Sequence, residues 1–341
     1  MKISVLGVGS WGSALGMVLG ENGHEVQGWG NETSVVDDIN EHQANRKYLQ
    51  EIQLPTNFTA TLDLEESLKD AQMVLVVLPT AAIREVTGRV NDILGRLGTQ
   101  PLIIHATKGL ERGSHLRISE IIEEVTDREN YEDLVVLSGP SHAEEVARHD
   151  LTAITAASKN LAAAEKVQEI FTNSYFRVYT NTDVSGVEWG AALKNVIALA
   201  TGLAVGLGLG DNAVASLITR GLAEIARLGV AKGADPITFG GLSGVGDLIV
   251  TCMSPHSRNW QAGQLLSQGY NKEQIAEKVM MVVEGISTCQ AATELAEEEG
   301  IEMPITQGLY RVLYEGEDVQ EVLSELMERS TKQEASLTNS F

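Results

Sequence analysis

The chain has 341 residues, which predicts about two domains. Its 43% hydrophobic and 21% charged residues exclude a disordered or fibrous protein. With 25 Lys and Arg against 47 Asp and Glu, the net charge is -22, so the surface repels phosphate backbones and nucleic acid is not an expected partner. The same field repels small anions, so a phosphate site has to be made locally positive by a few Lys and Arg side chains.

Two cysteines, Cys252 and Cys289, form neither a CxxC pair nor a Cys/His group with metal-ligand spacing. This predicts a cytoplasmic protein without a structural metal. The apolar first 20 residues contain a single basic residue and regularly spaced glycines, which disfavours a signal peptide. The apolar stretch 196–210 is short and glycine-rich for a membrane span, so stable membrane insertion is not expected.

Through the first half of the chain, short β-branched runs alternate with helical segments. Continuous apolar runs such as residues 73–78 indicate strands that are buried on both faces, as in a parallel sheet. This alternation predicts a doubly wound, Rossmann-like α/β sheet. The predicted strands are residues 3–6, 25–29, 73–78, 102–106, 134–137, 153–156 and 176–179, and the predicted helices are residues 11–19, 62–71 and 115–125.

The pattern changes after about residue 183, where strand-like runs disappear and Ala/Leu/Ile-rich segments with helical spacing take over. We therefore predict an N-terminal Rossmann-like, dinucleotide-binding domain at residues 1–182. An all-helical C-terminal domain, which would bind the substrate and carry the catalytic residue, is predicted at residues 183–330. Residues 331–341 are polar and rich in Ser and Thr, and are expected to form a tail.

A glycine motif, Gly7-x-Gly9-x-x-Gly12, follows the first predicted strand and opens the first helix. Gly7 allows the tight turn, Gly9 lets a pyrophosphate approach the backbone, and Gly12 allows close packing, while the helix N-terminus supplies partial positive charge. The motif predicts dinucleotide binding, with Ser10 and Trp11 facing the cofactor. For Trp11, packing beneath the loop is the alternative.

The residue that follows the second strand bears on the choice between NAD and NADP. An acid at this place would hydrogen-bond the ribose 2′-hydroxyl of NAD, but the chain has Asn31 here. An amide accepts a 2′-hydroxyl without strongly repelling a 2′-phosphate. The cofactor preference therefore stays open, with Arg46 and Lys47 as candidate phosphate partners.

Two further predicted strands end in polar turns, Ala106-Thr107-Lys108-Gly109 and Ser138-Gly139-Pro140-Ser141. Ligands of open α/β sheets bind beyond the carboxyl ends of the strands. We therefore expect Lys108, Gly139 and Ser141 to face a binding cleft.

A single cation, Lys194, lies in the middle of an apolar helical segment of the C-terminal half. Its helical neighbours, including Gly190, are mostly small, which suggests room for a ligand beside the ammonium. A buried lysine loses solvation, so a functional role is favoured over a packing one. The polar run Ser257-Arg258-Asn259 offers a guanidinium fork that suits a phosphate, and Asp247 could orient Lys194 or accept from a substrate hydroxyl.

Taken in order, these blocks resemble the bacterial-type NAD(P)-dependent glycerol-3-phosphate dehydrogenases, over essentially the whole chain to about residue 330. Many members of that family carry a basic residue or His where this chain has Asn31. The matching blocks are Gly7-Val-Gly9-Ser10-Trp11-Gly12-Ser-Ala, Ala106-Thr-Lys108-Gly-Leu-Glu, Leu137-Ser-Gly-Pro-Ser141-His-Ala143, Ala192-Leu-Lys194-Asn-Val, Gly206-Leu-Gly-Leu-Gly-Asp211-Asn212, Gly244-Val-Gly-Asp247-Leu, Ser257-Arg258-Asn259 and Val282-Val283-Glu284-Gly285.

The resemblance implies reversible hydride transfer between NADPH or NADH and dihydroxyacetone phosphate, giving sn-glycerol 3-phosphate for phospholipid synthesis. It implies that Lys194 is the catalytic acid/base, and it assigns no role to Trp260, Met280 or Met281. The implied substrate contacts are Lys108, Gly139, Ser141, Lys194, Asp247, Ser257, Arg258 and Asn259. The implied cofactor contacts, beside the glycines and Asn31, are Ser10, Trp11, Lys108, Ala143, Arg258, Val282 and Glu284.

The expected partners are the small-molecule substrate and a second copy of the chain in a homodimer. One alternative is another dehydrogenase of the same architecture that acts on a hydroxyacyl thioester, a sugar phosphate acid or a keto acid. A second alternative is a non-catalytic dinucleotide sensor, which would leave Lys194 unexplained.

Overall fold

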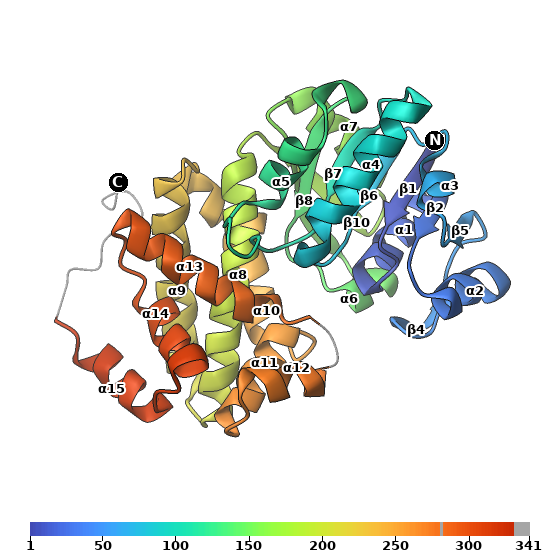
Figure 1. Ribbon diagram of the computed structural model, residues 1–341. Coiled ribbons are helices and arrows are strands. Elements are labelled where there is room, and N and C mark those ends of the chain that lie inside the picture. The colour runs from blue at the N-terminus through green and yellow to red at the C-terminus, as the bar shows by residue number, and fades with distance from the viewer. Residues whose placement is uncertain (280–281, 331–341) are drawn as a thin grey trace. The chain divides into compact units, whose positions relative to one another are not determined.

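The computed structural model describes residues 1–279 and 282–330, so Met280, Met281 and the predicted tail lie outside the described residues. The chain divides into two compact units (Figure 1). The first unit comprises Met1–Thr107 and Ile118–Val184, and the second comprises Lys108–Arg117 and the chain from Ser185 onward. The short segment Lys108–Arg117 thus belongs to the second unit although both of its flanks belong to the first.

The first unit is built on an eight-stranded sheet with the strand order β10-β9-β8-β7-β6-β1-β2-β5. All seven predicted strands are present, with ends that differ by one or two residues, and β5 is an additional edge strand. A separate pair, β3 and β4, is also absent from the sequence prediction. The strands are β1 (Lys2–Leu6), β2 (Glu25–Trp29), β3 (Ala44–Asn45), β4 (Leu49–Gln53), β5 (Phe58–Thr61), β6 (Met73–Val76), β7 (Leu102–His105), β8 (Leu134–Ser138), β9 (Thr152–Ala157) and β10 (Phe176–Asn181).

The sheet is parallel apart from one pairing, because β9 runs antiparallel to β8. From β1 the chain builds outward to β2 and β5 on one side and to β6, β7 and β8 on the other. The strand order therefore reverses between β1 and β6. In open α/β sheets this reversal opens a crevice at the carboxyl ends of the strands, where ligands bind.

The helices of the first unit form two groups, as expected for right-handed crossovers made in opposite directions from β1. Helix α4 contacts both α3 and α5, and α1 contacts both α6 and α7. Helix α4 is absent from the sequence prediction, and predicted helix 62–71 is shortened to α3 because the Asp63 side chain caps its start. The helices are α1 (Ser10–Glu21), α2 (Thr33–His42), α3 (Leu64–Leu68), α4 (Ile83–Leu97), α5 (Ile118–Val125), α6 (Ala143–Ala147) and α7 (Leu161–Phe171).

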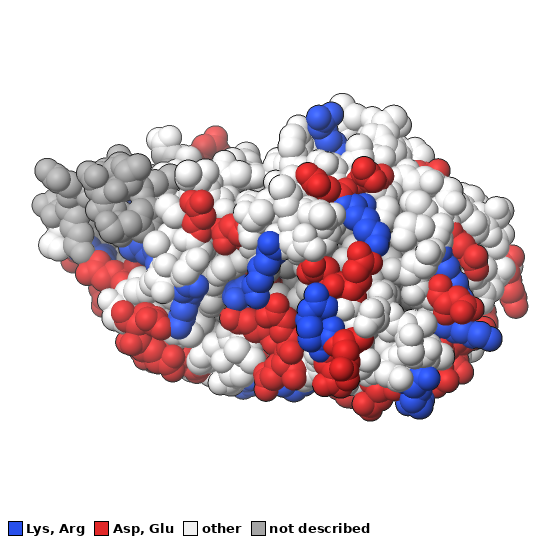
Figure 2. Space-filling view, turned by 90° about the horizontal axis from the view of Figure 1, so that it is seen from above, with Lys and Arg blue, Asp and Glu red and all other residues white. Residues whose placement is uncertain are grey.

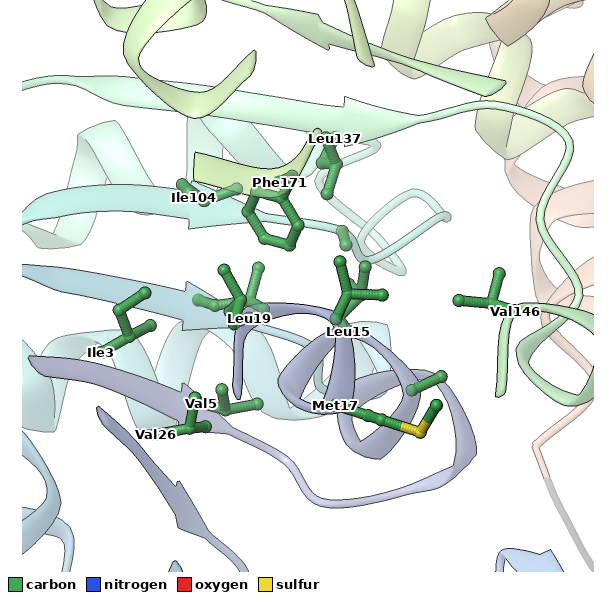
Figure 3. Packing of buried hydrophobic residues seen from close by; sticks show 14 of the residues in the cluster. Ile3, Val5, Leu15, Met17, Leu19, Val26, Ile104, Leu137, Val146 and Phe171 are labelled. Atoms are coloured by element: carbon green, nitrogen blue, oxygen red, sulfur yellow. The ribbon is translucent and has the colours of Figure 1, made fainter. Parts of the chain in front are cut away.

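Acidic residues are spread over the surface, in keeping with the net charge (Figure 2). Several Lys and Arg side chains pair with them, as Arg84 does with Glu124 at 2.9 Å. Beneath the surface, the core of the first unit lies between the sheet and its helices. Leu15 and Leu19 of α1 point toward Phe171 of α7, and all three are fully buried (Figure 3).

The second unit is helical, as the sequence predicts. Its central helix, α8, is apolar and long enough to cross a membrane by length and composition alone, but most of that stretch is buried inside the protein. The apolar stretch 196–210 is thus the second half of a longer helix and the turn that follows it. The helices are α8 (Val184–Gly206), α9 (Asp211–Ala231), α10 (Asp247–Met253), α11 (Arg258–Ser267), α12 (Lys272–Val279), α13 (Glu284–Glu299), α14 (Pro304–Tyr310) and α15 (Val319–Glu328).

Helices α8 and α11 approach each other closely where small residues face one another. A Cβ atom built on Gly202 of α8 would lie 2.0 Å from the carbonyl oxygen of Trp260 on α11. The backbones could not pack this closely with any larger residue at position 202. This contact holds the first turn of α11 against the C-terminal half of α8, eight residues after Lys194.

Candidate active site

The glycine motif forms the turn between β1 and α1, at the end of the strand from which the sheet order reverses. A Cβ atom on Gly12 would lie 1.8 Å from the carbonyl oxygen of Gly7, so only glycine lets the helix start this close to the strand. A Cβ atom on Gly9 would meet no atom within 4 Å, so the backbone there faces open space. The first turn of α1 contains no acidic residue. These features fit a dinucleotide pyrophosphate at the helix N-terminus.

The turn is supported by Asn45 of β3, a residue that no sequence pattern singled out. Its amide nitrogen donates to the carbonyl oxygen of Val8 at 2.8 Å and to Ser13 Oγ at 2.9 Å. Trp11 packs against the apolar core, while its indole nitrogen is buried without a partner among the described residues. Trp11 therefore packs against the core and still offers an indole N–H donor, so its contact with the cofactor stays a prediction.

Asn31 lies in an exposed bend directly after β2. The next residue, Glu32, accepts hydrogen bonds from Lys47 and from the Tyr48 hydroxyl, and these bonds lower the pKa of its carboxyl group. Arg46 pairs with Asp38 at 3.3 Å. Both cations that the sequence suggested as phosphate partners therefore have carboxylate partners, and Glu32 is an acid directly after Asn31 that was not selected from the sequence.

The polar turn after β8 lies in the same unit. Gly139 has a φ of +148°, and a Cβ atom there would lie 2.8 Å from the Cα of Ile154. Ser141 is partly buried, and its hydroxyl donates to the carbonyl oxygen of Gly139 at 3.0 Å. Ala143 begins α6 and is buried. Gly139, Ser141 and Ala143 thus belong to one short turn at the carboxyl end of a central strand.

In the second unit, three charged side chains that are far apart in the sequence converge. Asp247, the first residue of α10, is 1% exposed and accepts hydrogen bonds from two lysines. Lys108 Nζ donates to Asp247 Oδ2 at 2.8 Å, and Lys194 Nζ donates to Asp247 Oδ1. Because Lys108 belongs to segment Lys108–Arg117, this cluster lies entirely within the second unit.

Thr251 completes the cluster, and it was not selected from the sequence. Its Oγ1 accepts from Lys194 Nζ at 2.8 Å and donates to the carbonyl oxygen of Asp247 at 2.6 Å. Thr251 follows Asp247 by four residues on α10, so the helical period puts both on one face. That spacing was the available signal.

Burial sets the protonation of Lys194. Desolvation lowers its pKa, Asp247 opposes this shift and the Lys108 ammonium adds to it, and together they bring the pKa to about 7. Burial alone would raise the pKa of Asp247, but the two ammonium groups outweigh that effect and lower it. Asp247 is therefore a carboxylate at neutral pH, while Lys194 exchanges its proton near neutrality.

Gly190, one of the small neighbours of Lys194, allows close helix packing and leaves no space for a ligand. A Cβ atom on Gly190 would lie 2.5 Å from the carbonyl oxygen of Ser243, so backbone already fills that space. Gly190 therefore adds no room for a ligand, and the expected room beside the Lys194 ammonium stays a prediction.

The polar run that opens α11 is tied to two other helices. Ser257 caps α11, and Arg258 donates to the carbonyl oxygen of Val282 at 3.0 Å. Asn259 donates to Asn195 Oδ1 at 2.9 Å and accepts from the Gly285 amide at 2.8 Å. Asn195 directly follows Lys194, and Glu284 starts α13 directly before Gly285. The structure thus joins the Ser257–Asn259 run to α8 and to the Val282–Glu284 segment.

Chemically, the second unit offers an ammonium that titrates near neutrality, a carboxylate that holds it, and a guanidinium near the start of a helix. The first can donate or accept a proton at a carbonyl or hydroxyl oxygen. The guanidinium can bind a phosphate. The glycine turn of the first unit supplies the features of a dinucleotide site.

The chain matches two family models. The N-terminal model of NAD-dependent glycerol-3-phosphate dehydrogenase matches residues 2–164, and the C-terminal model matches residues 183–324. A relative from Enterococcus faecalis named glycerol-3-phosphate dehydrogenase of the NAD(P)+ type is 58% identical over 340 residues, 100% of this chain and 99% of that protein. A relative of the same name from Ligilactobacillus salivarius is 56% identical, covering 98% of each chain.

A solved structure is also similar over nearly its whole length. The crystal structure of a glycerol-3-phosphate dehydrogenase from Coxiella burnetii has a TM-score of 0.90 and 38% sequence identity, covering 96% of this chain and 99% of that one. The likeness includes the sheet and the helical unit.

Proposed function

The chain belongs to the NAD-dependent glycerol-3-phosphate dehydrogenase family, and we propose that its Lys194–Asp247–Lys108 cluster carries the proton chemistry of that reaction. The enzyme is an NAD(P)-dependent oxidoreductase that interconverts dihydroxyacetone phosphate and sn-glycerol 3-phosphate, the glycerol backbone of phospholipids. The buried Lys194 ammonium, held by Asp247 and Thr251, is the observation that carries the proposal.

A bound nicotinamide supplies or accepts the hydride at C2 of the substrate. Gly7, Gly9 and Gly12, with Ser10 and Trp11, would hold the dinucleotide at the start of α1. Lys194 uses two N–H groups for Asp247 and Thr251, and its third N–H is proposed to face the C2 oxygen. In reduction, Lys194 stabilises the growing negative charge on that oxygen and donates the proton; in oxidation, the amine accepts it.

The remaining site residues are proposed to bind and orient. Lys108 and Asp247 would hold the C2 oxygen and orient Lys194, while Gly139, Ser141, Ser257, Arg258 and Asn259 would contact glycerol phosphate. Ala143, Lys108, Arg258, Val282, Glu284 and Asn31 are proposed cofactor contacts. In this scheme residues 1–182 bind the dinucleotide and residues 183–330 bind the substrate.

The decisive assay follows the absorbance of reduced nicotinamide with dihydroxyacetone phosphate and each cofactor in turn. The proposal expects turnover with this substrate and none with keto acids or acyl thioesters. Tight cofactor binding without turnover would instead support a dinucleotide sensor. We further propose a cytoplasmic homodimer, which light scattering after size-exclusion chromatography tests through the mass in solution.

The pKa of Lys194 near 7 predicts opposite pH profiles for the two directions. Reduction needs the ammonium, so its kcat/KM is expected to fall about tenfold per pH unit well above 7. Oxidation needs the amine, so its kcat/KM is expected to fall below pH 7. Initial rates at subsaturating triose or glycerol phosphate from pH 5.5 to 9.5 measure both limbs. Parallel profiles for the two directions would contradict proton transfer through Lys194.

Arg258→Lys is expected to raise the KM for dihydroxyacetone phosphate about tenfold or more. Lysine retains the charge but loses the two-pronged donor geometry that suits a phosphate. Steady-state kinetics at saturating NADPH measure the change, and Arg220→Lys on α9 is the matched control. An unchanged KM in Arg258→Lys would place the phosphate elsewhere.

Asn31→Asp is expected to shift cofactor preference toward NADH by about tenfold to a hundredfold in the ratio of specificity constants. A new carboxylate accepts the ribose 2′-hydroxyl and repels a 2′-phosphate. The adjacent Glu32 is already engaged by Lys47 and Tyr48, so wild type is expected to use NADPH measurably. Asn31→Gln, which adds length without charge, is the control. If both variants keep the wild-type ratio, Asn31 does not face the ribose.

A further inference from the structure

Segment Lys108–Arg117, defined here as the strap, carries Lys108 into the second unit. An antiparallel bridge pairs Leu110 with Arg117, and the Glu111 amide donates to the carbonyl oxygen of Leu116 at 2.9 Å. The strap is therefore a closed loop whose two arms are hydrogen-bonded. Arg117 pairs with Leu110, and Leu110 lies two residues after Lys108. The position of Arg117 therefore determines the position of the arm that carries Lys108.

The strap is held to α8 by an ion pair that the proposed proton chemistry does not use. Arg117 Nη1 lies 2.6 Å from Glu188 Oε2, and the two side chains are 15% and 5% exposed. Glu188 precedes Lys194 by six residues on α8, about 9 Å along the helix axis. One helix thus carries both the anchor of the strap and the proposed catalytic lysine.

Besides the hydrogen bond from Lys108 to Asp247, Leu110 and His115 of the strap also contact the second unit. Leu110 is 2% exposed and joins the core of the second unit, which is a non-directional contact. His115 pairs with Glu294 of α13 at 2.6 Å, and Glu294 is 41% exposed, so solvent screens that pair. The Arg117–Glu188 pair is a directional contact with α8 that is largely shielded from solvent.

A buried ion pair is a weak stabiliser, since its desolvation cost offsets much of its attraction. Its best-attested use is to specify one arrangement over others. We infer that Arg117 and Glu188 are positioning residues for the reaction, which hold the strap in the register that keeps Lys108 on Asp247 beside Lys194. The expected loss of activity rests on the proposed function. The placement of Lys108 by the ion pair rests on the geometry alone.

The first measurement needs no substrate. Amine acetylation followed by peptide mass spectrometry gives the labelling rate of Lys108, with Lys232 of the same molecule as the internal reference. Lys108 is 17% exposed and hydrogen-bonded to Asp247, so it is protected in wild type. Arg117→Gln is expected to raise the Lys108 rate about tenfold relative to Lys232. Arg112→Gln makes the same change at an exposed position of the strap and is expected to leave that rate unchanged.

The second measurement is kinetic. Arg117→Gln is expected to lower kcat/KM for dihydroxyacetone phosphate by on the order of 10²-fold, the cost of misplacing a reacting group by about 1 Å. Arg117→Lys restores the charge and is expected to recover part of the loss. The Arg117→Gln/Glu188→Gln double variant is expected to be no worse than the more impaired single variant, because both break one contact.

Glu188→Gln keeps the volume of the side chain and an acceptor for Arg117. It therefore still tests the ion pair if Arg117→Gln does not fold. Folded variants of both residues with wild-type protection of Lys108 would overturn the inference. So would unfolding of all three single variants, since the pair would then support the whole unit. A wild-type protein without turnover of dihydroxyacetone phosphate would overturn the proposed function instead, while the labelling result would still report on the strap.

Discussion

Lys194→Met is expected to lower kcat for dihydroxyacetone phosphate reduction by at least a hundredfold, and by up to about 10⁴-fold. Methionine fills the space of the lysine stem but can neither donate the proton nor stabilise the oxyanion. Asp247 retains Lys108 as its partner, so the site keeps one ammonium and the fold is expected to survive.

Steady-state kinetics with NADPH measure the effect, and circular dichroism confirms the fold. Lys232→Met is the matched control, because Lys232 is also a partly buried, ion-paired lysine of the second unit. NADPH fluorescence is expected to show cofactor binding in both variants. Near-normal turnover by the Lys194→Met variant would show that Lys194 does not take part in the proton transfer.

Asp247→Asn is expected to lower kcat/KM at pH 7 by on the order of 10²-fold. Asparagine keeps the shape of the side chain but removes the negative charge that opposes the desolvation of two ammonium groups. Without that charge the pKa of Lys194 falls below 7, so less of it is protonated at neutral pH. Reduction is therefore expected to recover partly as the pH is lowered.

The same change is expected to destabilise the protein by about 3–5 kcal/mol, the usual cost of breaking a buried ion pair by removing one partner. Thermal or denaturant unfolding measures this loss. Asp318→Asn is the matched control, because Asp318 caps the exposed start of α15 and asparagine caps equally well. A pH profile identical to wild type in Asp247→Asn would show that Asp247 does not set the protonation of Lys194.

Local patterns in the sequence determined most of the first unit. The seven strands were predictable because most are short runs rich in apolar or β-branched residues, and the glycine turn was predictable because its three glycines lie within six residues. Strands β3 and β4, which show no strong period, were not predicted from the sequence. The antiparallel direction of β9 was not predicted either. The direction of β9 depends on which neighbour it pairs with, and no pattern within the strand encodes that choice.

The candidate site divides in the same way. Lys194 could be selected from the sequence because a lone cation in an apolar helix is costly to bury. Asp247 could be suggested as a partner of Lys194, but no local pattern placed Lys108 and Lys194 on the same carboxylate, because they lie 139 and 53 residues from Asp247. The support that Asn45 gives to the glycine turn is equally non-local.

The sequence by itself determined the chemistry available to this protein: a dinucleotide turn, a buried lysine, a guanidinium beside a helix start and a surface of charge -22. Only the tertiary structure decided that Lys108 leaves the first unit, meets Lys194 on a shared carboxylate and is tied to α8 through Arg117. The physical reason is that residue type and helical period determine structure only among residues close in the sequence. The partners of a buried charge depend instead on how distant segments of the chain pack.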